Sequence, residues 1–158
     1  MSRIYTISFA EVAVTAAQDM FEILVPADAV MRLHSIVITQ SSDAKNSESE
    51  QLPFSIKRVT GAPTSGSGGS TPTPRPISQG DAAAGITAEA NNTTRLTGGT
   101  SVDLWREDIN VMSGWYYIPT PEMRIDFSPS TRCIIGLEEA PEDSLTMSGT
   151  VVVEEIGG

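Results

Sequence analysis

Two side chains in this sequence of 158 residues have the chemistry of a nucleophile, base or metal ligand near neutral pH, and each occurs once: His34 and Cys133. A hydrolytic triad would need His34, but the chain has no G-x-S-x-G elbow. A zinc site needs more such ligands. His34 lies in the alternating stretch MRLHSIVITQ, and Cys133 lies in the apolar run TRCIIGLEEA. We therefore expect a structural histidine and a small buried thiol, with no catalytic residues, no metal and no cofactor.

The carboxylates occur in adjacent pairs: Glu107-Asp108, Glu138-Glu139, Glu142-Asp143 and Glu154-Glu155. Neighbouring residues on a strand face opposite sides, so no pair forms a two-carboxylate glycosidase site by itself. The stretch 138–155 contains six acids and no base, and we interpret it as a solvated face. Docking onto a basic protein surface and binding of a divalent cation stay open as alternatives.

The formal net charge is −10, and the ten basic residues are scattered except for the adjacent pair Lys57-Arg58. A protein that binds phosphate backbones needs clustered lysine and arginine, so nucleic acid is not an expected partner. No apolar run approaches the ~20 residues that a membrane span needs, so no membrane association is expected. The N-terminal stretch MSRIYTISFAEVAV alternates like a strand and does not resemble a signal peptide. The expected site of synthesis is a cytoplasm.

The central stretch GAPTSGSGGSTPTPRPISQGD, residues 61–81, invites comparison with a phosphate-binding loop. It has no lysine, does not match G-x-x-x-x-G-K-[ST], and is followed by prolines instead of a helix. A phosphate loop is therefore excluded.

Aromatic residues gather in SGWYYIPTP, where a strand would place Trp115 and Tyr117 on one face and Tyr116 on the other. Trp105 lies apart, next to Arg106 and two acids. A core position combined with a subunit contact explains the WYY cluster without a ligand, and we take Trp105, Trp115 and Tyr117 as possible interface aromatics. A carbohydrate-stacking platform of Trp115 and Tyr117 is the alternative.

The elements that position these residues are strands, because period-two alternation dominates the chain. Tyr5, Ile7 and Phe9 share one face, and Leu145, Met147, Gly149, Val151 and Val153 share another. In MRLHSIVITQ the alternation places Met31, Leu33, Ser35 and Val37 together, opposite Arg32, His34, Ile36 and Ile38. No stretch shows helical spacing over three turns. Eight to ten short strands, roughly counted, predict an all-β fold, a single jelly-roll-like β-sandwich.

The Gly/Ser/Pro-rich stretch 61–81 could separate two domains, but each half alone would bury little surface. We therefore expect one β-sandwich domain, residues 1–158, with 61–81 as a long loop or extended arm. The glycines indicate a hinge, and the prolines indicate a stiff reach of up to ~60 Å. We expect this arm to bind a partner and to gain its order from a neighbour. The residues assigned to it are Thr64, Ser65, Gly66, Ser67, Gly68, Gly69, Ser70, Thr71, Pro72, Thr73, Pro74, Arg75 and Pro76.

Four stretches together resemble a family of small proteins encoded by tailed bacteriophages, many of them presumed virion components. They are SRIYTISFAEVAVTAAQDMFEILVPAD, VITQSSDA, TSGSGGSTPTPRPISQGDAAAGITAEANNTT and PEDSLTMSGTVVVEEIG. The resemblance spans nearly the whole chain, and the central stretch is its most specific part. It carries over no catalytic residue.

The resemblance implies a non-enzymatic structural protein of the virion. Small jelly-roll proteins of this size serve as capsid cement or decoration proteins, seated as trimers on the major capsid protein. We therefore expect a capsid-surface protein, a homotrimer that binds and stabilises the major capsid protein shell. A carbohydrate-binding module of a phage tail or fibre, or a tail or neck adaptor, is the alternative.

Overall fold

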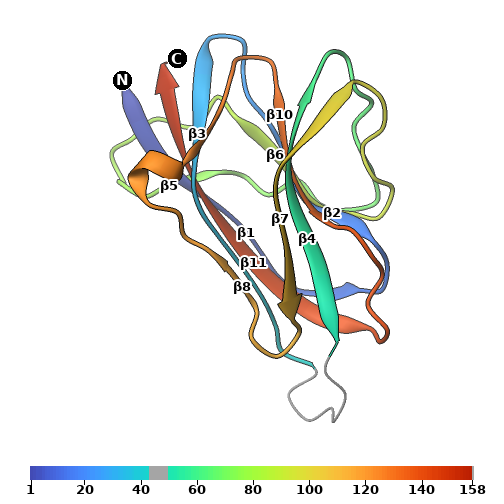
Figure 1. Cartoon of the computed structure of the whole chain (residues 1–158). Coiled ribbons are helices and arrows are strands. Elements are labelled where there is room, and N and C mark those ends of the chain that lie inside the picture. Colours follow the sequence, from blue (N-terminus) through green and yellow to red (C-terminus); the bar gives the residue numbers. More distant parts are fainter. Residues whose placement is uncertain (43–49, 158) are drawn as a thin grey trace.

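The computed structural model describes residues 1–42 and 50–157, which form two antiparallel β-sheets packed as a sandwich (Figure 1). The first sheet has the order β5-β1-β11-β3-β8, and β9 also pairs with β3. Its strands are β1 (Ser2–Val14), β3 (Ala29–Gln40), β5 (Arg75–Pro76), β8 (Trp115–Tyr117), β9 (Ile125–Phe127) and β11 (Leu145–Gly157). The two chain ends lie side by side, since the Gly157 amide donates to the Met1 carbonyl at 3.0 Å.

The second sheet has the order β6-β2-β10-β4-β7. Its strands are β2 (Gln18–Leu24), β4 (Gln51–Thr60), β6 (Thr87–Asn92), β7 (Thr100–Asn110) and β10 (Arg132–Leu137). The one helical element of the described residues is a 3₁₀ turn, η1 (Pro121–Met123), and none of their helices could cross a membrane. β1 to β4 alternate between the sheets, and β10 and β11 insert between them, an order compatible with a jelly roll. Strands from both chain halves thus interleave in each sheet.

Alternation along β1 and β11 confirms the predicted core faces. Tyr5, Ile7 and Phe9 of β1 are buried, as is every second residue of β11 from Leu145 to Glu155. Phe21 on the opposite sheet meets Phe9 at a ring-centroid distance of 5.2 Å. The apolar side chains of the two sheets therefore form one core.

The faces predicted for β3 are correct only for its first half. The buried residues of β3 are Ala29, Met31, Leu33, Ile36 and Ile38. The pairing with β11 shifts register here: Leu33 opposes Val153 and Ser35 opposes Val152. His34 is therefore an extra residue in a β-bulge, and a bulge exchanges the two faces of all residues that follow it.

Residues 61–81, which we call the crossing segment, bind the sandwich of their own chain. Thr64 pairs with Thr97, Ser67 with Thr94, and Ser70 with Ala90 in β6. Each pair exchanges reciprocal backbone hydrogen bonds of 2.8–3.1 Å. β5 then pairs with β1, so the crossing segment passes from the second sheet to the first. Thr64–Pro76 are therefore ordered by their own chain, which corrects the expectation of a free, hinged arm. That these residues bind a partner stays a prediction.

Glycine in the crossing segment permits a close approach between two backbone segments of the chain instead of providing flexibility. A Cβ at Gly69 would lie 2.0 Å from the Ala90 carbonyl oxygen, and one at Gly66 would lie 2.5 Å from the Thr94 carbonyl oxygen. The segment covers the outer edges of β1 and β6, where exposed backbone groups invite pairing with other chains. We call this the closed side of the sandwich. The opposite side, where β7 and β8 end the two sheets, is the open side.

Candidate functional site

His34 and Cys133 occupy structural positions. His34 is half-buried, and its Nε2 lies 2.8 Å from the Glu154 carboxylate. Hydrogen bonds from Ser2 and His34 lower the pKa of Glu154. Cys133 is fully buried in β10, and burial raises the pKa of its thiol far above the ordinary value. The expectations of a structural histidine and a buried thiol agree with these placements.

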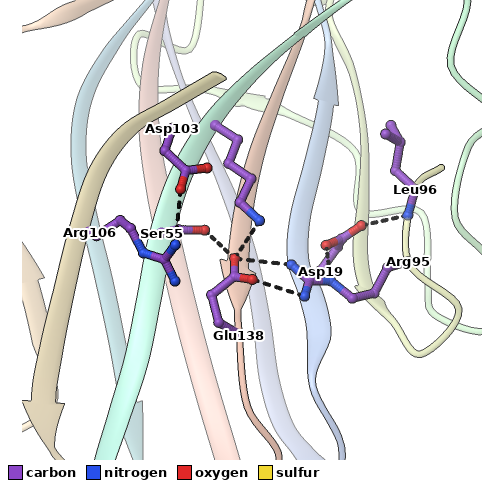
Figure 2. A network of polar contacts seen from close by, with 8 residues as sticks. Asp19, Ser55, Arg95, Leu96, Asp103, Arg106 and Glu138 are labelled. Carbon is purple, nitrogen blue, oxygen red and sulfur yellow. Dashed lines mark hydrogen bonds and ion pairs between the residues drawn. The ribbon is translucent and has the colours of Figure 1, made fainter. Parts of the chain in front are cut away.

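Glu138 forms an ion cluster on the second sheet with three other side chains, those of Asp19, Lys57 and Arg95 (Figure 2). Arg95 donates to both Glu138 oxygens at 3.1 Å, and Lys57 lies 2.8 Å from one of them. Ser55 donates to the same carboxylate. Asp19, only 2% exposed, accepts from Arg95 and from the Leu96 amide. The charges of two acids and two bases balance within the cluster. The cluster links β2, β4 and the end of β10 to the connection between β6 and β7.

The ion cluster controls the protonation of Glu138. Burial acts to raise its pKa, but hydrogen bonds from Arg95, Lys57 and Ser55 outweigh burial and lower the pKa from 4.5 to about 2. Burial acts to lower the pKa of Arg95, yet its hydrogen bonds to Glu138 and Asp19 raise it overall. Both groups are therefore charged in the folded state across the physiological range.

The depressed pKa of Glu138 predicts a stability change in acid. The ionised carboxylate stabilises the fold above about pH 4.5, and this contribution is lost as the pH falls toward about 2. Glu138→Gln should lower stability at pH 7 and flatten the decline between these values, as measured by urea unfolding at each pH. Glu139→Gln, which changes the exposed neighbour, is the control and should follow the unsubstituted protein. Parallel curves for the two variants would contradict the assignment.

The acidic stretch 138–155 is not one solvated face, which corrects the expectation. Glu138 is in the ion cluster and Glu154 contacts His34. Glu155 is 3% exposed and accepts the amides of Gly85 and Ile86 at 2.9 and 2.8 Å. The described residues contain no group of three or more His, Cys, Asp or Glu placed to hold a metal ion.

Glu22 is a further buried carboxylate that sequence reasoning did not select. It is 2% exposed in β2 and accepts from the Ser65 hydroxyl at 2.9 Å and the Gly66 amide at 3.0 Å. Arg132 forms its ion pair. Glu22 thus holds the first part of the crossing segment, at Ser65 and Gly66. Glu155 holds the chain just after the segment, at Gly85 and Ile86. Alternation with the core residues Phe21 and Ile23 places Glu22 on the other face of β2, where Ser65 and Gly66 cover it. The sequence FEILV therefore held no signal for the burial of Glu22.

Two of the three candidate interface aromatics are core residues. Trp115 is 1% exposed and stacks on Phe54 at 4.9 Å, and Tyr117 is 5% exposed. β8 turns both rings inward because it closes the edge of the first sheet over the core. The prediction that they lie at an interface is wrong, and so is the carbohydrate platform built from them. Trp105 is 39% exposed, as an interface residue would be.

The open side carries a groove of about 290 Å³ beside Trp105. Its walls combine Trp105 and Glu107 of β7 with the chain from β8 to η1, including Tyr116, Ile118 and Met123. Tyr116, Ile118 and Met123 are exposed by 59, 70 and 60%. The alternation in WYYI already separated Tyr116 from the two core rings, so the sequence contained a signal for it. The same alternation places Ile118 on the side of Tyr116. Met123 had no such signal, because its position depends on the turn at Pro119–Pro121.

Glu107 fixes the aromatic rings around this groove. Its Oε2 accepts the indole N–H of Trp105 at 3.0 Å and that of Trp115 at 3.1 Å. Trp105 also meets Tyr117 edge-to-face at 5.2 Å. An aromatic ring held in place and half exposed loses little conformational entropy when a partner covers it. The groove is therefore suited to docking of an apolar surface.

Comparison with protein-family models, with curated proteins and with solved structures gives no match for this chain. The structure itself defines the class: an all-β protein with a two-sheet sandwich. Its candidate functional site is the aromatic groove on the open side.

Proposed function

We propose that the protein is a structural subunit of a tailed-phage particle, a capsid cement or decoration protein that binds the major capsid protein. The observation that supports docking is the exposed aromatic and aliphatic groove of the open side. The resemblance described above supports the phage particle as its setting. The docking surface in this proposal differs from the arm that the sequence suggested, since the crossing segment is bound to its own chain.

The composition of the groove fits a protein interface. Tryptophan, tyrosine and methionine are enriched in interface cores, and a few such residues supply most of the binding free energy. Single exposed apolar side chains are ordinary on protein surfaces, but here four line one groove. A tail or neck adaptor would use the same surface, and the copy number in the particle separates it from a cement protein.

The test is co-sedimentation of the purified protein with capsids that lack it. Tyr116→Ala combined with Ile118→Ala should raise the Kd at least about tenfold, because both side chains are exposed and removable without opening the core. Ile77→Ala is the matched control, as Ile77 is 61% exposed at the closed side. Equal binding by all three proteins, or no binding by any, would refute the proposed function.

A further inference from the structure

The outer edge of β7 has no strand partner among the described residues. β7 is 11 residues long and pairs on one side with β4 from Gln51↔Asn110 to Thr60↔Thr100. The second sheet ends there. Most β7 side chains are exposed, including Val102 at 51% and Trp105 at 39%. By contrast, the crossing segment covers the edges of the closed side. A long open edge beside an apolar groove is the arrangement that accepts an added strand.

The charges along this edge define which strand it accepts. β7 carries Asp103, Arg106, Glu107 and Asp108, and Arg106 is already paired with Asp103 at 3.1 Å. In the described part of the chain, Glu107 and Asp108 have no ion-pair partner. A neighbouring strand with lysine or arginine opposite them would gain cross-strand charge pairs, whereas an acidic strand would be repelled.

A second copy of this chain fits the edge poorly. Each copy has a net charge of −10, and two β7 strands together would hold six acids against two arginines. β7 also has a register shift opposite Ile56/Lys57, and bulges and edge charges of this kind oppose indiscriminate pairing. The edge therefore discriminates in favour of a basic partner.

We infer that the open side binds an extended basic segment of the partner protein, which adds as a strand to β7 and places an apolar side chain in the groove. This inference rests on the proposed function and specifies the chemistry of the partner. Backbone hydrogen bonds along β7 align the segment. The groove of Trp105, Tyr116 and Ile118 takes its apolar side chain. Asp108, on the face of β7 opposite to Glu107, meets its cations.

The test uses three synthetic peptides that share one β-strand pattern and differ in charge: KVTVKVTV, QVTVQVTV and EVTVEVTV. The lysine peptide should slow amide hydrogen exchange within residues 100–110 and change Trp105 fluorescence, and its affinity should fall as salt rises. Asp108→Lys should weaken this binding at least about fivefold, and the control Asp28→Lys should not. Asp28 is exposed and outside the groove.

Absence of protection in β7, or equal protection by the lysine and glutamate peptides, would overturn the inference. Protection of β7 that appears in the protein alone, as it forms a concentration-dependent dimer, would assign the edge to a second copy and overturn the inference as well. The proposed function fails separately, in the capsid experiment with Tyr116→Ala and Ile118→Ala. Capsid binding that depends on these residues, with no peptide effect, would reject only the inference.

Discussion

Gly69→Ala should destabilise the protein by about 3 kcal/mol, whereas Gly80→Ala in the same crossing segment should be neutral or slightly stabilising. A Cβ at Gly69 would lie 2.0 Å from the Ala90 carbonyl oxygen and 2.7 Å from the Asn91 carbonyl carbon. Both atoms are backbone, so the crossing segment itself must move away and break the Ser70↔Ala90 pair. A Cβ at Gly80 would meet nothing within 4 Å.

Urea unfolding of both variants measures this difference, and amide exchange locates it. Amides of residues 64–70 should exchange faster in Gly69→Ala than in the unsubstituted protein, and their exchange rates should be unchanged in Gly80→Ala. A free arm would tolerate alanine equally at both positions. Equal stability of the two variants would therefore contradict the docked crossing segment.

Glu22→Ala should destabilise the fold by about 3–5 kcal/mol, because it leaves Arg132 without its partner. The same change removes the acceptor for the Ser65 hydroxyl and the Gly66 amide. Unfolding in urea gives the stability. Glu142→Ala, an exposed acid, is the control and should change stability by less than about 0.5 kcal/mol.

Glu22→Gln serves where the alanine variant does not fold. Glutamine keeps the oxygen that accepts from Gly66 but loses the charge that pairs with Arg132, so its stability should fall between the unsubstituted protein and Glu22→Ala. Proteolysis should then cut within residues 61–81 before the rest of the chain. Stability equal to the Glu142→Ala control would show that Glu22 does not anchor the crossing segment.

The sandwich was predictable from the sequence because alternation reports which face of a strand is buried. Tyr5, Ile7 and Phe9 follow it without interruption. The prediction fails for Ile36 and Ile38, since a bulge at His34 exchanges faces and leaves no compositional mark. The prediction that Glu155 is solvated also fails. Alternation along β11 assigns Glu155 to the core face, but its charge suggested that it faces solvent.

The crossing segment shows the limit of composition as a guide. Glycine indicates freedom in an isolated chain, but it also permits backbones to approach where no Cβ fits, as at Gly66 and Gly69. Only the segment that it pairs with, Ala90–Thr97, distinguishes the two uses, and the pairings Ser70↔Ala90 to Thr64↔Thr97 join residues 20 to 33 positions apart in the sequence. For the same reason the aromatic groove was predictable only in part. Trp105 was selected and alternation places Tyr116 and Ile118 together, while Met123 depends on tertiary placement.

Electron cryomicroscopy of capsids decorated with the protein tests the central claim most directly. The proposal predicts that the open side, with β7, Tyr116 and Ile118, faces the shell, and that the crossing segment faces away from it. Density that joins the shell to residues 64–76 instead would contradict the docking surface proposed here and support an arm. Density in which the open side is solvent-exposed on every copy would contradict it equally.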